Sequence, residues 1–482
     1  MIGMLSATTA AAGLDASASV SAFGTGASAS SSDGDVTAVL PRQPRTVRDT
    51  GLDPCLVTGL VLKVLHAGGK TPLSRLTGRL RLSVSVVREV LQGLVAGQQA
   101  EVAYSGDTDL DVHYQLTVAG ARAAGEHLAE SRYAGPAPVT LAAWRAVVAQ
   151  QSQRQPDAPR VARTELEAVL DGDGLEPATR ELIGAALYSS RPLLLYGPSG
   201  SGKTTLARKF ARLRQDPIAV PYAVLVNHEI VQLHDPALHP APLQMRGLEE
   251  RRSCDARWQL SQRPLVHVGA ELTRDMLELR VDAASGVLRA PPHILANNGL
   301  LVLDDLGRQR MPAGELLHRW LGALEAGQDH VTVPHGPSHA LPFDVGLVLA
   351  TSLAPESVLD DACLRRIGYR IAVGPLSEAS YRALLRRQAR LRRIEVDEAA
   401  FDYLIDELHR RTRRPLLAAW PHELLGRIAD FAGCAGRAPR CDVDGLVQAW
   451  SSLFGASALP PALPCASNPA AVKREDNEGG AR

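Results

Sequence analysis

The chain has 482 residues, 45% of them apolar and 22% charged, and its formal net charge is zero. This length and composition are typical of a soluble globular protein with about three domains. A zero net charge excludes a global electrostatic field that attracts nucleic acid or membranes, so any such contact must be local.

Cysteine usage and the first residues indicate a cytoplasmic protein. The six cysteines are scattered without a CxxC pair, which argues against a disulfide or zinc framework and for a reducing compartment. The chain start lacks the basic and apolar regions of a signal peptide. We find no apolar run of about 18 residues, so we expect no transmembrane helix.

Composition divides the chain into three folded regions between two tails. The tails are rich in Ala, Ser, Gly or Pro and bury too little apolar surface to order themselves. The predicted layout is a disordered tail over 1–45, a helical domain with its linker over 46–150, an α/β core over 155–375, a helical region over 376–455 and a second disordered tail over 456–482.

The first folded region has the pattern of a winged helix. Apolar residues recur at helical spacing over 55–68, 71–82 and 83–99. An alternating segment on each side of a polar turn then predicts a hairpin over 100–117. Ser83 is a suitable N-cap for the third helix, whose predicted buried face consists of Val86, Val87, Val90, Leu91 and Leu94.

Two interpretations of this winged helix remain open. For DNA binding, the third helix would enter the major groove and expose Ser85, Arg88, Glu89 and Gln92, with Arg75, Arg79 and Arg81 near phosphates. Residues 46–125 hold eight Lys or Arg and seven Asp or Glu, far from the basic footprint of a DNA binder. The predicted wing tip also carries three aspartates, Asp107, Asp109 and Asp111, which a phosphate backbone would repel. The charge pattern therefore favours docking of a protein.

The second region alternates short buried strands with helices, as parallel sheets do. Its first strand leads into LLLYGPSGSGKTTL (193–206), which fits G-x-x-x-x-G-K-[ST] at every constrained position. The glycines let backbone N–H groups face phosphate oxygens, and the following helix adds its positive dipole. Lys203 would contact the β and γ phosphates, and the Thr204 hydroxyl would bind Mg²⁺. The predicted nucleotide-binding residues are Gly197, Pro198, Ser199, Gly200, Ser201, Gly202, Lys203, Thr204 and Thr205.

A second motif, LLVLDD (300–305), supplies the partner carboxylates about 100 residues later. Asp304 ends an apolar strand and would hold Mg²⁺ with Thr204. Asp305 would polarise the attacking water. The remaining predicted strands are the apolar runs PYAVLVN (221–227) and VGLVLAT (345–351), and helical patterns follow over 377–393, 397–411 and 420–433.

These motifs together resemble the AAA+ superfamily of P-loop ATPases over residues 160–455. The resemblance implies an α/β core with a parallel sheet and a C-terminal helical lid, ATP and Mg²⁺ as cofactors, and a homo-oligomer. VGLVLATSL (345–353) is similar to the sensor-1 strand, with Thr351 and Ser352 where the family carries Asn, and the role passes to Ser352. DDACLRRIGYRI (360–371) resembles the arginine-finger segment, so Arg365 or Arg366 would reach the nucleotide of a neighbouring subunit. His422 stands where the sensor-2 Arg is expected.

The layout also resembles a little-characterised bacterial family of predicted ATPases with an N-terminal winged helix. The insert over 263–292 is similar to that of the MoxR-like and helix-2-insert groups, which implies a chaperone-like remodeller. The alternative is an ATP-gated DNA-binding regulator, because the missing sensor residues would slow turnover. The sequence lacks LSGGQ, GAFTGA and NKxD motifs, which argues against a transporter ATPase, a usual σ54 activator and a GTPase.

Overall fold

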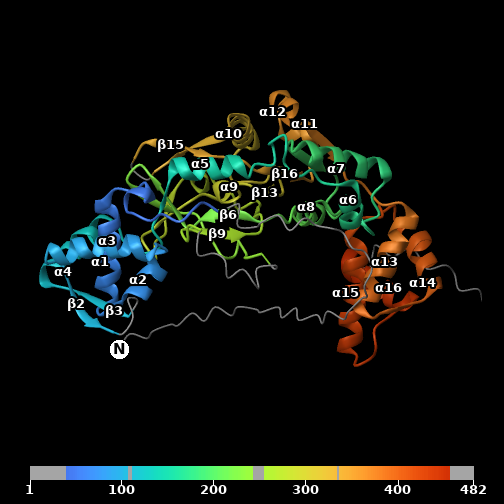
Figure 1. The fold of residues 1–482 in the computed structure, drawn as a ribbon. Helices are drawn as coiled ribbons and strands as arrows, with labels where there is room; N and C mark the ends of the chain where they lie inside the picture. The colour runs from blue at the N-terminus through green and yellow to red at the C-terminus, as the bar shows by residue number, and fades with distance from the viewer. Residues whose placement is uncertain (1–39, 107–110, 243–253, 334–335, 456–482) are drawn as a thin grey trace, which may run out of the picture. The chain divides into compact units, whose positions relative to one another are not determined.

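The computed structural model describes residues 40–106, 111–242, 254–333 and 336–455 (Figure 1). Most of the two predicted tails lies outside these residues, as do Asp107 and Asp109 of the predicted wing tip. Among the described residues, no helix has the length and hydrophobicity needed to cross a membrane.

The N-terminal module, residues 40–130, contains the helices and hairpin in the predicted order. Its three strands form an antiparallel sheet in the order β1-β3-β2, and a bulge between Val102 and Tyr104 interrupts the hairpin. The elements are η2 (Arg48–Thr50), α1 (Pro54–Gly68), β1 (Thr71–Pro72), α2 (Leu73–Leu80), α3 (Val84–Ala96), β2 (Ala100–Ser105), β3 (Val112–Leu116) and α4 (Val118–Glu130).

Helix α3 shows why this module folds as the sequence indicates. The Ser83 side chain accepts a hydrogen bond from the Val86 N–H and caps the helix. All five residues of the predicted apolar face are buried, at helical spacing, against α1 and α2. Ser85, Glu89 and Gln92 are exposed as predicted, whereas Arg88 is half-buried.

The centre of the second region is a five-stranded parallel sheet in the order β10-β13-β16-β5-β17. The predicted strands at the start of 193–206, in 300–305 and in 345–351 all belong to it. Its strands are β5 (Leu193–Tyr196), β10 (Leu265–Val268), β13 (Leu300–Leu303), β16 (Gly346–Thr351) and β17 (Tyr369–Ala372). The fold class expected from the sequence, an α/β core around a parallel sheet, is therefore confirmed.

Helices cover both faces of this sheet, because successive side chains of each strand point to opposite faces. Leu193 and Leu195 pack against α6, α7 and α8, while Leu194 joins the core beneath α9, α10 and α12. The helices are α5 (Leu141–Gln150), α6 (Arg163–Leu170), α7 (Pro177–Ser189), α8 (Lys203–Phe210), α9 (Pro292–Leu295), α10 (Ala313–Ala326), α11 (Pro355–Val358) and α12 (Asp361–Arg366).

Two strand assignments differ from the sequence prediction. The run at 221–227 forms β7 (Ala223–Val226), which belongs to a second, mixed sheet in the order β11-β12-β8-β7-β4. The insert over 263–292 instead supplies β10, an edge strand of the parallel sheet. An edge strand has one neighbour only, so its alternating burial hides the pattern of a buried parallel strand.

The other short elements complete the core. They are β4 (Val139–Thr140), η3 (Ala211–Leu213), β6 (Ile218–Pro221), β8 (Glu229–Gln232), β9 (Trp258–Ser261), η6 (Arg274–Leu277), β11 (Arg280–Val281), β12 (Leu288–Arg289), β14 (Gln328–Thr332) and β15 (Ser338–Pro342). Strand β4 pairs with β7, and Trp144 and Val148 of α5 are buried in the same core. Arg257 is buried in an ion pair with Asp255 and donates to the carbonyls of Thr50 and Pro138.

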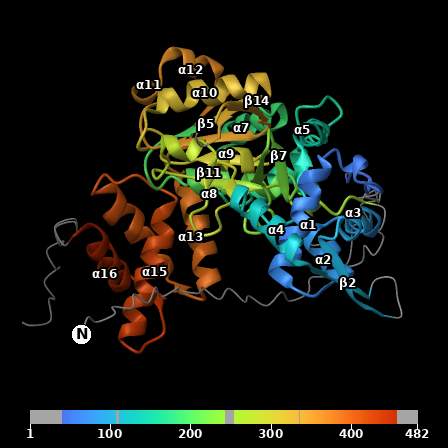
Figure 2. The same cartoon turned by 90° about the vertical axis from the view of Figure 1, so that its left-hand side faces the viewer.

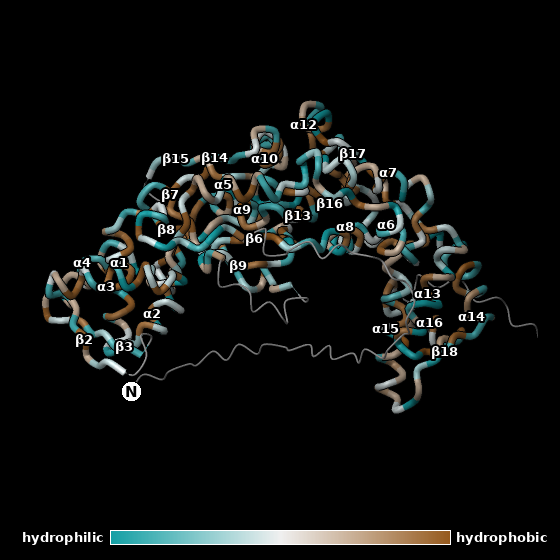
Figure 3. The backbone as a smooth tube through the Cα atoms, in the orientation of Figure 1, coloured by the Kyte–Doolittle hydropathy of each residue, from teal (hydrophilic) through white to brown (hydrophobic). Residues whose placement is uncertain are grey.

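The C-terminal helical region, residues 376–455, has its own apolar core around Tyr381, Phe401 and Trp450. Its helices lie together in two views (Figures 1 and 2). Hydrophobic and hydrophilic segments alternate along α13 in Figure 3, as expected for a helix with one buried face. The elements are α13 (Glu378–Arg392), β18 (Glu395–Val396), α14 (Glu398–Asp402), the π-helical η7 (Tyr403–Arg410), α15 (Ala419–Cys434), β19 (Arg440–Cys441) and α16 (Val443–Phe454).

Candidate nucleotide-binding site

The loop between β5 and α8 has the backbone conformation that a phosphate cradle needs. Gly197, Gly200 and Gly202 have φ values of 143°, 84° and 98°, which residues with a Cβ rarely adopt. At Gly197 a Cβ would lie 2.3 Å from the Val373 carbonyl oxygen. The loop leads directly into α8, so the positive end of that helix faces the loop.

Lys203, the first residue of α8, is buried and folds back onto this loop. Its Nζ donates to the carbonyl oxygens of Gly197 at 2.8 Å and Pro198 at 2.9 Å. Burial lowers the pKa of Lys203, and the carboxylates of Asp304 and Asp305 oppose that shift. The ammonium group therefore sits inside the loop in a partly desolvated setting, where an anion would stabilise its charge.

Thr204 and Asp304 meet although 100 residues separate them. The Thr204 hydroxyl donates to Asp304 Oδ2 at 2.6 Å. His267 of β10 brings Nε2 to 3.3 Å from the same oxygen, because β10 and β13 run parallel with His267 opposite Val302. A hydroxyl, a carboxylate and an imidazole thus converge at the carboxyl ends of the strands, where ligands bind in open α/β sheets.

Asp305 has an unusual backbone conformation, with a φ of 51°, in the left-handed region that Asp tolerates better than most residues. The Gln309 side-chain amide donates to the carbonyls of Asp304 at 2.9 Å and Asp305 at 3.1 Å. The Asp305 N–H donates to Asp304 Oδ1 at 3.0 Å. These bonds hold the turn and leave the exposed Asp305 carboxylate available to solvent.

The two polar residues at the end of β16 have different surroundings. The Thr351 hydroxyl is buried and donates to the Leu306 carbonyl at 2.8 Å, so it joins β16 to the turn after β13. The Ser352 hydroxyl is half-buried and accepts a hydrogen bond from Arg308 at 3.2 Å. Of these two residues, Ser352 is therefore the one whose hydroxyl does not bond to the backbone of a neighbouring segment.

The first turn of α15 contacts the loop between β5 and α8, residues 197–202, which we call the phosphate loop. The Ala419 N–H donates to the Gly200 carbonyl at 2.9 Å, and a Cβ built on Gly202 would lie 3.6 Å from the Ala418 Cβ. His422 follows Ala418 by four residues, so the two share a helix face. Arg392 of α13 brings Nη2 to 2.7 Å from His422 Nδ1.

Arg365 and Arg366 lie at the opposite edge of the sheet. They end α12, which leads into the amino end of β17, and Arg366 lines a hollow with Arg191 and Pro192, which precede β5. Arg366 Nε is 3.7 Å from Glu325 Oε1, and Arg365 is exposed. The four residues of β5 span about 13 Å, so Arg366 is remote from the phosphate loop of its own chain.

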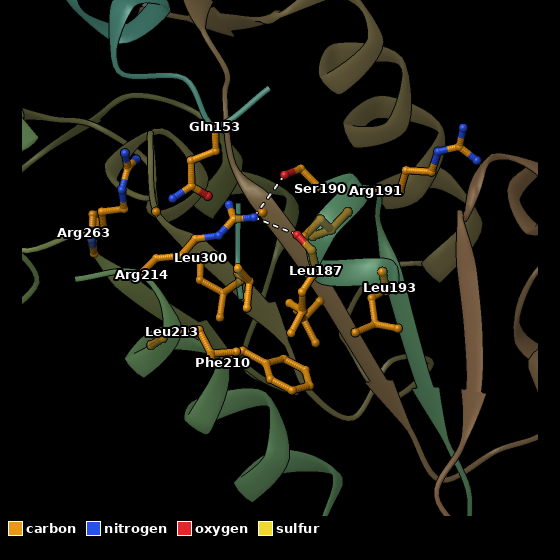
Figure 4. A pocket seen from close by; sticks show the side chains of 18 residues that line it. Gln153, Leu187, Ser190, Arg191, Leu193, Phe210, Leu213, Arg214, Arg263 and Leu300 are labelled. Carbon is orange, nitrogen blue, oxygen red and sulfur yellow. Dashed lines mark hydrogen bonds between the residues drawn. The ribbon is translucent and has the colours of Figure 1, made fainter. Parts of the chain in front are cut away.

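An apolar cavity occupies that same edge, away from the phosphate loop (Figure 4). Leu193, Leu300 and Phe210 line it, and the Arg214 guanidinium donates to Ser190 Oγ and the Leu187 carbonyl. Burial, as the largest cause, lowers the pKa of Arg214 to about 10. The Arg214 guanidinium is thus bound to the protein itself, and the apolar lining does not resemble a phosphate site.

The structure thus brings most of the sequence-predicted site residues together, and the arginine pair stands apart. Within the described residues, Ser201 Oγ is buried without a hydrogen-bond partner, while Pro198, Ser199 and Thr205 are exposed. A donor buried without a partner is costly unless a ligand satisfies it. Together with the Thr204 and Asp304 oxygens, which suit Mg²⁺, these features fit a metal-bound nucleotide. Sequence reasoning missed His267, Gln309 and Arg392, which carry no local motif.

The comparisons with known proteins assign no function. A domain of unknown function, DUF8689, matches residues 377–452. No curated protein matches the chain. Among solved structures, NtrX from Brucella abortus in complex with ATP is 14% identical, with a TM-score of 0.36, over 67% of this chain and 61% of that one.

A second solved structure is the RuvB Holliday junction branch migration motor of Thermotoga maritima. It is 17% identical with a TM-score of 0.32, over 61% of this chain and 70% of that one. The chain spans about three fifths of the length of NtrX. Likenesses of this degree are too weak to transfer an activity or a partner.

Proposed function

We propose that this protein is an AAA+ ATPase that binds ATP with Mg²⁺ and hydrolyses it to ADP and phosphate. One observation carries the proposal: the Thr204 hydroxyl lies 2.6 Å from Asp304 Oδ2, directly after the buried Lys203 in a loop of positive-φ glycines. A strand-turn-helix corner without a nucleotide has no need of a buried lysine beside a hydroxyl–carboxylate pair.

The chain's own residues then have distinct roles. Loop N–H groups and Lys203 would hold the phosphates, exchanging the lysine's bonds to the loop carbonyls for phosphate oxygens. Thr204 and Asp304 would hold Mg²⁺, which neutralises charge on the transferred phosphoryl group. Asp305 would orient the attacking water and accept its proton. His267 is a positioning residue that fixes the Asp304 carboxylate.

The helical region would act as the lid over this site. Support comes from the contact of Ala419 with Gly200 and from the Arg392–His422 pair beside it. We propose that Arg392, from a different helix, supplies the cation that the sequence lacks at position 422. Arg427 pairs with Glu423 at 2.6 Å and is a less suitable candidate.

We further propose that the active form is a homo-oligomer. Arg365 or Arg366 would complete the site of a neighbouring subunit, since Arg366 is remote from its own phosphate loop. An arginine supplied in trans stabilises charge on the γ-phosphate during hydrolysis.

The energy of ATP hydrolysis would serve to remodel a client protein. This client would dock on the N-terminal module, which would act as a protein-binding winged helix. Two of the arginines expected near DNA phosphates are engaged within the chain: Arg79 donates to the Ala134 carbonyl at 3.1 Å, and Arg81 lies over the Tyr222 ring at 5.2 Å. The alternative, an ATP-gated DNA-binding regulator, draws support from the exposed Ser85, Glu89 and Gln92 on α3.

The test is steady-state ATP turnover per protomer as protein concentration rises, with Lys203→Ala and Arg366→Ala beside the parent. We expect the parent rate to climb with concentration and both variants to lose activity. Mixing them should restore turnover, because the inactive Lys203→Ala chain still supplies an arginine. A rate that is flat with concentration and indifferent to Arg366 would refute the oligomeric mechanism. No turnover in the parent at any concentration would refute the ATPase itself.

A further inference from the structure

Three metal-ligating side chains meet where α10 packs against α12, outside the nucleotide site. His318 comes from α10, Asp360 caps the N-terminus of α12, and Cys363 lies in its first turn. His318 Nε2 is 3.2 Å from Asp360 Oδ2 and 3.8 Å from Cys363 Sγ. One ligand atom of each residue lies within 4.8 Å of the other two.

The two separations from His318 match edges of a tetrahedral zinc site. Zn–N and Zn–O bonds of about 2.0–2.1 Å and a Zn–S bond of about 2.3 Å give tetrahedral edges of about 3.3 Å for N to O and 3.6 Å for S to N. The measured 3.2 Å and 3.8 Å differ from these by about 0.2 Å at most. The imidazole thus already lies at about the right distance from the other two ligand atoms, and those two atoms lie within 4.8 Å of each other.

The donor set and its surroundings also suit this ion. A thiolate, an imidazole and one carboxylate oxygen favour zinc over Mg²⁺ or Ca²⁺, which prefer oxygen ligands. Asp360 Oδ1 accepts the Cys363 N–H at 2.8 Å, which orients the carboxylate and leaves Oδ2 directed at His318. The side chains of His318 and Asp360 are 49% and 55% exposed, so a water molecule can reach a fourth position.

We propose that His318 Nε2, Asp360 Oδ2 and Cys363 Sγ form a zinc site that joins α12 to α10. On binding, the Cys363 thiol loses its proton to solvent and its sulfur bonds to Zn²⁺. Rules based on residue spacing do not detect this site, because its ligands come from two helices and include no CxxC pair.

Zinc binding at this site would also affect the proposed arginine fingers. Arg365 and Arg366 follow Cys363 within the same short helix, so an ion bound at its first turn would fix the helix that presents them. The zinc site itself does not depend on the proposed ATPase activity.

The test uses the metal-free full-length chain titrated with Co²⁺ and followed by absorbance. We expect one equivalent to give a thiolate-to-cobalt charge-transfer band with the visible bands of tetrahedral Co²⁺, and Zn²⁺ to abolish them. A Co²⁺ ion at Thr204 and Asp304 would lack the sulfur band. The readout therefore separates this site from the nucleotide site.

Variants assign the ligands. Cys363→Ser should abolish the sulfur band, and Cys434→Ser, at an exposed cysteine, should leave it unchanged. His318→Ala alters a half-exposed side chain, and Asp360→Asn keeps a good N-cap. Each variant removes a direct ligand, so each should weaken metal binding at least about 100-fold, the largest usual cost of changing a residue that only supports a ligand. Absence of a sulfur band in the parent would overturn the proposal. A band that survives in both His318→Ala and Asp360→Asn would also overturn it, even if Cys363→Ser failed to fold.

Discussion

Replacing Thr204 by Val removes the hydroxyl that meets Asp304 and keeps nearly the same shape. The matched control is Thr205→Val, one residue later on the same helix, because Thr205 is exposed whereas Thr204 is half-buried. Both positions lie in the first turn of α8, so any cost of a β-branched residue is already present in the parent.

The magnitude follows from the contact that is lost. The Thr204 hydroxyl donates to a carboxylate at 2.6 Å, and a hydrogen bond to a charged group contributes about 1.5–3 kcal/mol. At about 1.4 kcal/mol per tenfold change in affinity, this corresponds to a loss of about 10- to 100-fold. We expect the Mg²⁺ concentration needed for half-maximal turnover to rise by that factor, because the hydroxyl is also a proposed metal ligand.

The assay is ATP turnover as a function of free Mg²⁺ at saturating ATP, with nucleotide binding in EDTA as a second readout. Thr204→Val should shift the Mg²⁺ dependence and leave metal-free nucleotide binding within about twofold. Thr205→Val should match the parent in both. If the two variants shifted the Mg²⁺ dependence equally, the hydroxyl–carboxylate pair would not be a metal site.

Three further predictions concern the carboxylate, the lid and pH. Asparagine tolerates the same left-handed backbone as Asp305, so Asp305→Asn should preserve ATP binding. It should lower turnover at least about 100-fold, because a general base contributes a rate factor of about that size. Unchanged turnover would contradict the proposed role of Asp305. Arg392→Ala should lower turnover about tenfold or more by removing one charge from the phosphates, while Arg427→Ala, measured in the same assay, should not. Burial lowers the pKa of His234 and His409 from 6.5 to about 4. The unfolded chain therefore takes up these protons at higher pH, and the free energy of unfolding should fall by about 2–3 kcal/mol for each of the two histidines between pH 6.5 and 4. Urea denaturation at several pH values measures this, and a constant midpoint would refute it.

Much of the candidate site could be predicted because its chemistry is local in the sequence. The phosphate loop needs glycines, a lysine and a threonine at fixed spacing in one strand-turn-helix unit, and β5 and α8 form that unit. The apolar face of α3 was likewise predictable, since helical spacing and the Ser83 cap are properties of adjacent residues. The tails and the domain boundaries stay predictions.

Other features arise only when distant segments meet. His267 reaches Asp304 because β10 pairs in parallel with β13, and an edge strand with alternating burial carries no signal for that pairing. Arg392 reaches His422 from another helix, as His318 reaches Cys363. The sequence by itself determined the strand-turn-helix unit with its positive-φ glycine loop, the carboxylates that end β13 and the α/β class, because short-range geometry dictates them. The tertiary structure alone decided strand order, the partners of Asp304, and the separation of Arg366 from its own phosphate loop, because these depend on contacts between residues tens to a hundred positions apart.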